Sequence, residues 1–328
     1  MDVFEFLNPV MKTSRWFGLA PLTQTCNTRK YQFSRPWLLY TFLFITCHFA
    51  IEMMIKFDPS VGSREVVLNA TSGVVGPLTF VLALGMNFSS LLHVTNLISL
   101  VNKLASLVPP KLTHKYSRIE KKSVSYVCVG LVLTVTAFTF SFRNAYSSSR
   151  LNSYLLTISG NARYLLVILP YQQLVHFLII FEEHFSFINS EIETIFLGMK
   201  EIPQHSQQRE GVTYRRGGIT PLSNLHHQLC ELARQVNRIY CVQVTTMVAM
   251  ALLQVTICSY LDIRLLNTIS RQDPKMAVIY AMNVWNFIFT AKLTLLLVLC
   301  GRVSSQVSDS YSACFNVVIV IHSRRQVM

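Results

Sequence analysis

The sequence predicts an all-α membrane protein, a polytopic helical bundle with six transmembrane helices, long cytoplasmic helical extensions and a cytoplasmic N-terminus. Three observations lead to this fold class. Of the 328 residues, 51% are hydrophobic and only 14% are charged, whereas soluble domains carry about 25% charged residues. Six apolar runs have the length of a membrane span. The basic residues between these runs lie mostly on one side.

A helix needs roughly 20 apolar residues to cross a hydrocarbon core of about 30 Å. The six runs cover residues 36–55, 73–92, 124–142, 164–181, 240–261 and 276–300. Because they lack period-2 alternation, helices are expected rather than barrel strands. Residues 1–35 are then an N-terminal cytoplasmic segment. Residues 36–300 form the bundle with a cytoplasmic loop at 182–239, and residues 301–328 form a cytoplasmic tail.

The distribution of Lys and Arg sets the predicted orientation. Twenty of these residues fall on the side that holds the N-terminus and the 182–239 loop, and seven fall on the other side. Basic loops stay in the cytoplasm, so both termini are expected there. Asn69 belongs to an Asn-Ala-Thr sequon, expected in the first outer loop as a glycosylation candidate. None of the eight Cys lies in an outer loop, and they are interpreted as small buried hydrophobes.

Apolar periodicity continues past three of the spans. Leu97, Val101, Leu104 and Val108 extend the second span as far as Pro109-Pro110, and Ile188, Ile192, Ile195 and Met199 extend the fourth. A polar stretch at 203–221 is predicted to be a flexible loop. Leu225, Leu229, Leu232, Val236 and Ile239 then lead into the fifth span, predicting a helix of about 60 Å from residue 222 to 261. Its apolar stripe must pack on neighbouring helices or on another subunit.

Polar and aromatic residues in the outer halves of the spans are the candidate ligand site. Aromatic walls with a few amide or hydroxyl groups suit a small molecule, although interhelical hydrogen bonding would use the same residue types. The candidates are Tyr164, Tyr171, Gln254, Ser259, Tyr280, Asn283, Trp285 and Asn286. Lys292 lies in the sixth span, where an ionisable residue is costly and often functional, but snorkelling to the cytoplasmic interface is the favoured interpretation.

The sequence gives little support to a metal site, an enzyme or a nucleic-acid-binding protein. His226, His227 and Cys230 lack the fourth ligand of a structural zinc site, so no metal and no cofactor is expected. No nucleophile–base or metal constellation predicts an enzyme. Although the net charge is +13, the basic residues alternate with apolar spans, so lipid rather than nucleic acid is the expected partner.

Three stretches resemble the insect gustatory receptor family. Residues 6–22, "FLNPVMKTSRWFGLAPL", are similar to its N-terminal segment, where a basic residue precedes an aromatic-Gly-Leu-x-Pro turn. Residues 225–261, from "LHHQLCELARQVNRIY" to "VTICSYL", resemble its fifth helix. Residues 293–310, "LTLLLVLCGRVSSQVSDS", resemble the end of its sixth helix. The resemblance implies an inverted seven-span chemoreceptor of the plasma membrane, related to insect odorant receptors.

The resemblance also implies a tastant-gated cation channel that assembles as a homo- or hetero-oligomer, a tetramer in that family. Its seventh, pore-lining span has no counterpart here, because "FNVVIVIHSRRQVM" at 315–328 holds only seven apolar residues before Arg324 and Arg325. The chain is therefore expected to be truncated before that span, with residues 301–328 in its place. The tail is expected at the cytoplasmic interface or against the extension of the fifth span. A truncated, non-conducting subunit that only associates with full-length receptors is the alternative.

Two further classes are remote alternatives. A G-protein-coupled receptor would have the opposite orientation, an acidic-Arg pair ending its third span and a late Asn-Pro-x-x-Tyr, and the sequence shows none of these. A secondary transporter is expected to show inverted repeats with broken helices, and no internal repeat is seen.

Overall fold

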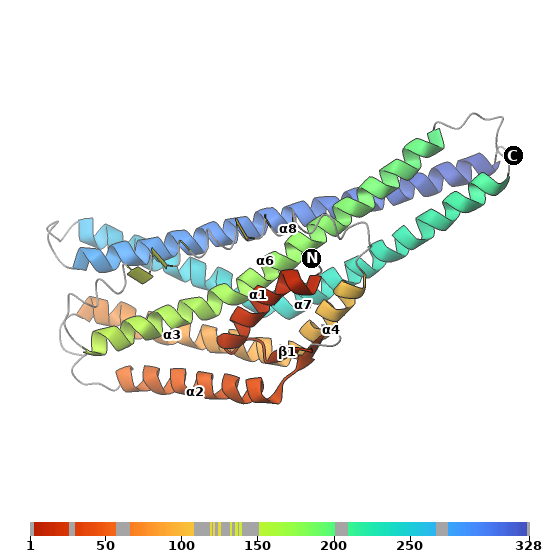
Figure 1. The fold of residues 1–328 in the computed structure, drawn as a ribbon. Coiled ribbons are helices and arrows are strands. Elements are labelled where there is room, and N and C mark those ends of the chain that lie inside the picture. The colour runs from red at the N-terminus through yellow and green to blue at the C-terminus, as the bar shows by residue number, and fades with distance from the viewer. Residues whose placement is uncertain are drawn as a thin grey trace.

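The computed structural model describes residues 3–25, 30–56, 66–107, 151–200, 209–266 and 275–326, together with isolated helical residues between 119 and 139. The elements in these ranges are α1 (Val3–Trp16), β1 (Leu22–Gln24), β2 (Tyr31–Phe33), α2 (Arg35–Lys56), α3 (Val66–Leu92), α4 (Val94–Ser106), α6 (Leu151–Lys200), α7 (Arg209–Leu266) and α8 (Lys275–Gln326). The chain is an all-α polytopic membrane protein, as predicted (Figure 1).

Helix α6 is the centre of the bundle. It contacts α1, α2, α3, α7 and α8. In the most apolar 18-residue stretch of its segment Leu165–Ile195, 83% of the residues are buried, compared with 44% and 33% in the corresponding stretches of α7 and α8. The core continues along α6 from Val167 to Ile192. The fourth predicted span is therefore the one that the other helices surround.

Five of the six predicted spans coincide with described helices. They lie within α2, α3, α6, α7 and α8, and the third, at 124–142, falls largely outside the described residues. By length and composition, three helices in the described residues qualify as membrane spans, and the bent pair α3–α4 makes a fourth. Exposed large side chains such as Phe42 on α2, Phe88 on α3, Leu252 on α7 and Phe287 on α8 give this part of the bundle an apolar outer surface.

The cysteines differ from the sequence interpretation. Cys258 is buried, but Cys47, Cys241 and Cys300 are exposed on the outside of their helices. The interpretation as buried hydrophobes is therefore wrong for these three. A thiol side chain can lie on the lipid-facing surface of these helices at little cost, because lipid, like a protein core, is an apolar medium.

The N-terminal segment folds into α1 and a small hairpin. Helix α1 buries Phe6, Leu7 and Met11 in the main core. Gly18 ends the helix with φ of +70°. Its N–H donates to the Arg15 carbonyl at 3.0 Å, and the Leu19 N–H donates to the Ser14 carbonyl at 2.9 Å, which is the pair of bonds in a Schellman cap. The predicted aromatic-Gly-Leu-x-Pro turn is thus the cap of α1.

Strands β1 and β2 pair antiparallel, with Thr23 opposite Gln32. The amide of Asn102, on α4, holds the hairpin through two bonds to Tyr31: Oδ1 accepts from its N–H and Nδ2 donates to its carbonyl, each at 3.1 Å. Helix α4 reaches this position because the α3–α4 segment bends by 57°. The extension of the second span was predicted correctly, since Leu97, Val101 and Leu104 are buried, but the sequence did not predict its bend.

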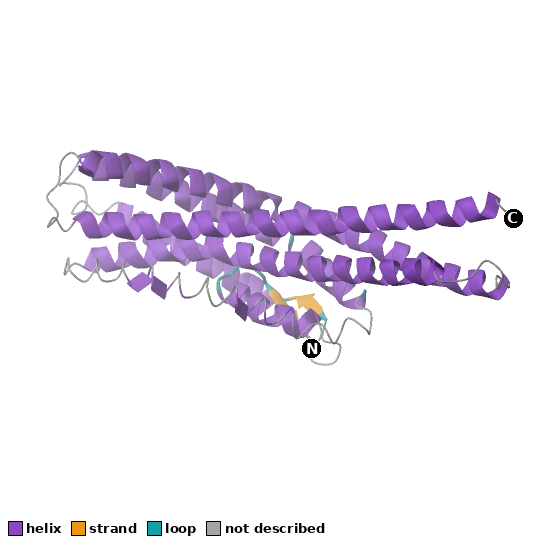
Figure 2. Cartoon of the chain, turned by 90° about the horizontal axis from the view of Figure 1, so that it is seen from above, coloured by secondary structure: helices purple, strands orange, loops and turns teal. Residues whose placement is uncertain are grey.

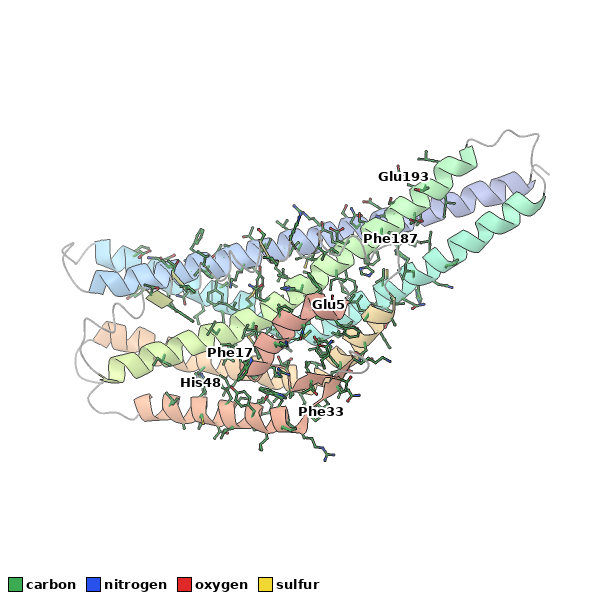
Figure 3. All side chains as sticks on the ribbon, in the orientation of Figure 1. Glu5, Phe17, Phe33, His48, Phe187 and Glu193 are labelled. Atoms are coloured by element: carbon green, nitrogen blue, oxygen red, sulfur yellow. The ribbon has the colours of Figure 1, made fainter. Side chains whose placement is uncertain are left out.

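Beyond the apolar part of the bundle, α6, α7 and α8 continue together past α1 and the hairpin, and we call this part the extension (Figure 1 and Figure 2). Ile188 and Ile192 of α6, Leu229 and Leu232 of α7 and Val303 of α8 belong to one core cluster. The predicted stripe therefore packs on neighbouring helices of the same chain. Glu193 lies on the exposed outer face of α6 (Figure 3).

The helices of the extension are longer than the sequence predicted. The 203–221 loop was expected to be flexible throughout, and this prediction is wrong because α7 begins at Arg209 and contains Pro221. Residues 301–328 were expected to form a cytoplasmic tail; residues 301–326 continue α8 as one 52-residue helix, about 78 Å long, and their cytoplasmic placement stays a prediction. The neighbouring ends of α6 and α7 explain this result, because a packed surface stabilises helix where the intrinsic propensity is weak. The side chains of 313–328 lie outside the described residues.

Candidate functional site

The structure separates the eight predicted ligand residues into three groups. Tyr171 and Gln254 are buried, and Asn283 and Asn286 are half-buried. Ser259 lies on the exposed face of α7, so the structure does not bring it toward the others. The side chains of Tyr164, Tyr280 and Trp285 lie outside the described residues.

The two amides near the ends of α7 and α8 make local contacts. Asn283 Nδ2 donates to the Asp262 carboxylate oxygens at 3.1 and 3.4 Å, which ties the start of α8 to the end of α7. Gln254 Nε2 donates to Cys258 Sγ one turn away, at 3.8 Å. The Asn283 contact is the interhelical bonding that the sequence left as the alternative interpretation, whereas the Gln254 contact lies within α7.

A different set of polar side chains crosses the interior from α3 to α8, and we call it the polar layer. On one side, Gln243 Nε2 of α7 donates to Ser90 Oγ of α3 at 3.4 Å. One turn earlier on α7, the Tyr240 hydroxyl donates to Gln173 Oε1 of α6 at 2.8 Å. Two residues before Gln173, the Tyr171 ring lies 5.7 Å from the Lys292 ammonium of α8. Four helices therefore contribute to this layer through three separate contacts.

Asn87 of α3, one turn before Ser90, is also buried, and we count it in the polar layer. Several atoms of this layer have no hydrogen-bond partner among the described residues. They are both side-chain polar atoms of Asn87, Gln173 Nε2, Gln243 Oε1 and Lys292 Nζ. A buried donor or acceptor without a partner costs about 1–3 kcal/mol, so such groups in a native protein are explained by a bound water, an ion or a ligand, or by a functional role. The layer carries more hydrogen-bonding capacity than its own residues use, so a polar molecule that entered it would find donors and acceptors.

The position of the Lys292 side chain differs from the one that the sequence predicted. It was expected to reach the aqueous interface, but its residue is only 5% exposed and its ammonium faces the Tyr171 ring. A cation–π contact within about 6 Å offsets part of the cost of burial. Ionisable residues held inside a membrane bundle commonly mark binding sites or ion pathways. Lys292 therefore belongs to the candidate site.

The sequence analysis missed Asn87, Gln173 and Gln243 because it selected residues by depth alone. All three are buried at 4% exposure or less. The signal available in the sequence was the occurrence of amides inside apolar runs, where each is costly unless it faces the bundle interior. Amides inside apolar runs mark Asn87, Gln173 and Gln243 in the sequence, as an ammonium inside such a run marks Lys292.

The structure also describes the predicted glycosylation site. Asn69 lies within α3, which begins at Val66, so its expected placement in a loop is wrong and glycosylation stays a prediction. In the part of the chain that the structure describes, no group of three or more His, Cys, Asp or Glu side chains is arranged to hold a metal ion.

The fold and the polar layer define a membrane protein whose helical bundle holds a band of buried polar side chains. Comparison with protein families identifies it further: the model of the 7tm chemosensory receptors matches residues 7–319. The chain belongs to the 7tm chemosensory receptor family. No curated protein matches it.

Proposed function

We propose that this chain is a gustatory chemoreceptor of the ligand-gated cation channel type. It detects small-molecule tastants at the plasma membrane of sensory neurons. Its family supports a chemoreceptor role, and the resemblance of residues 6–22, 225–261 and 293–310 to insect gustatory receptors supports the finer assignment. The charge asymmetry of the loops supports a cytoplasmic N-terminus and a cytoplasmic extension.

The polar layer is the observation that carries this proposal. It places one cation, an aromatic ring and several amides in an otherwise apolar interior. Sites for small molecules have this composition, with apolar walls and a few polar groups that fix the orientation of the ligand. A tastant with hydroxyl or carbonyl groups would satisfy the donors and acceptors that the layer leaves unpaired.

Asn286, two turns before Lys292 on the same helix, extends the polar layer toward the predicted outer side. Its Oδ1 has no hydrogen-bond partner among the described residues. The predicted candidates Tyr164, Tyr280 and Trp285 lie at neighbouring sequence positions on α6 and α8. We propose that these residues, with Tyr171 and Gln254, form the route by which ligand reaches the layer.

We further propose that several copies of the chain, or of related receptors, assemble in the bilayer around a common pore. Apolar side chains on the outer faces of α7 and α8, such as Leu252 and Leu297, are more than 60% exposed. Lipid or neighbouring subunits would cover such faces.

Replacing Lys292 tests the proposed ligand site. Lys292→Met keeps the length of the side chain and removes the ammonium, while Thr294→Val serves as the matched control. Thr294 is exposed and its hydroxyl bonds only within its own helix, to the Thr290 carbonyl at 2.9 Å. In cells that express the receptor, calcium imaging with a tastant panel measures the concentration for half-maximal response.

Lys292→Met is expected to raise the half-maximal concentration about tenfold or more, the value of one charge-assisted hydrogen bond. Surface expression should be unchanged, because methionine removes a buried charge without leaving a polar group unpaired. Thr294→Val should respond as the unmodified receptor does. Equal dose–response curves for both variants, at equal surface expression, would exclude Lys292 from the ligand site.

A further inference from the structure

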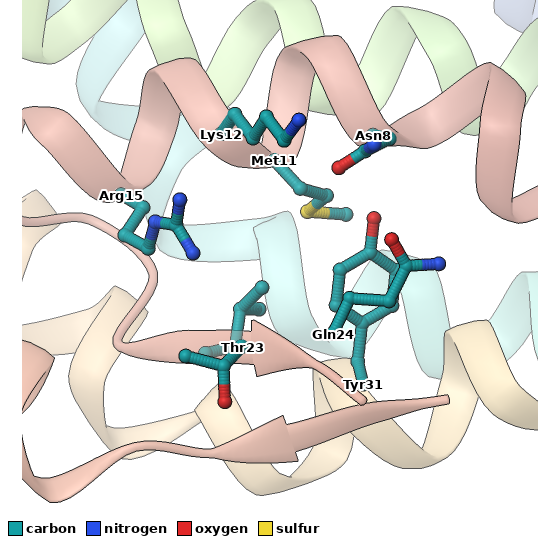
Figure 4. Close-up of a pocket in the computed structure, with 8 residues that line it drawn as sticks. Asn8, Met11, Lys12, Arg15, Thr23, Gln24 and Tyr31 are labelled. Atoms are coloured by element: carbon teal, nitrogen blue, oxygen red, sulfur yellow. The ribbon is translucent and has the colours of Figure 1, made fainter. Parts of the chain in front are cut away.

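A cavity of about 310 Å³ lies between α1 and the hairpin, away from the polar layer. It is lined by Asn8, Met11, Lys12, Arg15, Leu22, Thr23, Gln24 and Tyr31. Figure 4 shows Arg15 and Asn8 reaching from α1 toward the hairpin, and Tyr31 and Gln24 reaching back. The lining holds two cations and several neutral polar groups but no carboxylate. Its chemistry is that of an anion site.

The walls of this cavity are held in place from both sides. Asn102 binds the Tyr31 backbone through the two 3.1 Å bonds already described. At the turn of the hairpin, both the N–H and the hydroxyl of Thr25 donate to the Lys30 carbonyl, at 3.0 and 2.9 Å. Helix α1 is fixed by its buried apolar face. A cavity with fixed walls binds a ligand without first having to be ordered.

Arg15 is oriented before any ligand arrives. Its guanidinium carbon lies 4.4 Å from the centre of the Trp37 ring, a cation–π contact that restrains a flexible side chain. Its Nε is buried and has no hydrogen-bond partner among the described residues. A guanidinium held in this way presents a fork of donors that matches the oxygens of a phosphate. Lys12, one turn earlier on α1 and exposed, adds a second positive charge at the rim.

The aromatic residues beside Arg15 place the cavity at the level of lipid headgroups. The rings of Trp16 and Trp37 lie 5.6 Å apart, and Trp16 is 60% exposed. The Tyr40 hydroxyl donates to the Trp16 carbonyl at 2.7 Å, which joins α1 to the start of α2. Exposed Leu39, Phe42 and Leu43 follow on α2. Trp and Tyr gather at the membrane–water interface, so the cavity lies just outside the hydrocarbon core.

We propose that the cavity between α1 and the β1–β2 hairpin binds a phosphate monoester, with Arg15 and Lys12 as its cationic ligands. The headgroup of a phosphorylated inositol lipid is the favoured source, because the cavity adjoins the aromatic interface. This choice rests on the cytoplasmic N-terminus of the proposed function, which places the cavity at the inner leaflet, whose anionic lipids attract basic segments. This site lies outside the polar layer and is separate from the proposed tastant site. Its occupation would make the folded receptor responsive to the lipid composition of its membrane.

Titration of the full chain, purified in detergent, with short-chain phosphoinositides tests the proposal. The probes are dioctanoyl phosphatidylinositol 4,5-bisphosphate, soluble inositol 1,4,5-trisphosphate and dioctanoyl phosphatidylserine, which is anionic but has no phosphate monoester. The variants are Lys12→Gln, Arg15→Gln and Arg15→Lys. Arg35→Gln is the matched control, since Arg35 is exposed at the start of α2 and does not line the cavity. Size-exclusion elution confirms that each variant is folded.

The unmodified chain is expected to bind the bisphosphate lipid, and Lys12→Gln and Arg15→Gln are each expected to raise its Kd about tenfold. Arg15→Lys should lose less, and Arg35→Gln should bind normally. Binding of the soluble trisphosphate as tightly as the lipid would support the phosphate site and identify a soluble source, whereas binding of the lipid alone would identify the membrane. Equal loss in Arg35→Gln, equal binding of phosphatidylserine, or no binding of the bisphosphate lipid would overturn the proposal.

Discussion

Replacing Tyr240 by Phe tests whether the hydrogen bond from Tyr240 to Gln173 joins α7 to α6 in the polar layer. The substitution keeps the ring, which packs 6.0 Å from Phe177, and removes only the hydroxyl that donates to Gln173 Oε1 at 2.8 Å. Interhelical hydrogen bonds in membrane proteins contribute about 0.6 kcal/mol on average and about 1.7 at most. Because Gln173 is only 4% exposed, its unpaired carbonyl has little access to water, and we expect a loss near the upper value.

A double-variant cycle isolates this bond. The free energy of unfolding is measured by SDS titration in mixed micelles for the unmodified chain, Tyr240→Phe, Gln173→Leu and the double variant. Each single variant leaves the remaining partner of the bond buried and unpaired, whereas the double variant removes both partners. The double variant should therefore lose less stability than the two single variants lose when their losses are added. The coupling should be about 0.6–1.7 kcal/mol. Effects that are additive to within about 0.3–0.5 kcal/mol would refute the hydrogen bond between α6 and α7.

Three further substitutions probe the framework around the layer. Gly18→Ala should destabilise by about 1–2 kcal/mol, because φ is +70° there and the added Cβ would lie 3.4 Å from the Thr41 Cα; thermal unfolding in detergent measures it. Asn189→Leu should destabilise by about 1–3 kcal/mol, because it unpairs the fully buried Ser310 hydroxyl, and protease cleavage of the extension should accelerate. Gly301→Ala should stabilise α8 by up to about 1 kcal/mol, since nothing lies within 4 Å of the new Cβ; a loss in SDS titration would contradict this.

Hydropathy was sufficient to predict the spans because a transmembrane helix must satisfy its backbone internally and bury its length in lipid. The N-terminal segment has no comparable constraint. Its helix α1 is short, contains Pro9 and is stabilised by packing on α6 and α4. The hairpin has three residues in each strand and depends on Asn102, far away in the sequence. Local patterns carry no information about such a contact.

For the candidate site, the sequence predicts how deep a residue lies in the membrane but not which way its side chain points. A residue's position along a span follows from counting at 1.5 Å per residue, and this counting selected both Gln254 and Ser259. The face that a residue occupies depends on the neighbouring helices, so Gln254 is buried while Ser259, five residues later, is exposed. Lys292 was predicted to snorkel because its neighbours in space, including Tyr171, were unknown.

Helices α6 and α8 connect the polar layer to the extension without a break. Tyr171 and Lys292 meet in the layer, and further along the same two helices Asn189 Nδ2 donates to the Gln306 side chain at 2.9 Å. At 1.5 Å per residue, about 27 Å of helix separates these levels on α6 and about 21 Å on α8. A ligand that separated α6 from α8 at the layer would therefore also strain the polar contact in the extension, because continuous helices move as units. The exposed face of α8 changes from Leu297 and Val298 to polar residues after Gly301, so this connection would carry a change inside the membrane to the part of the protein that we propose lies in the cytoplasm.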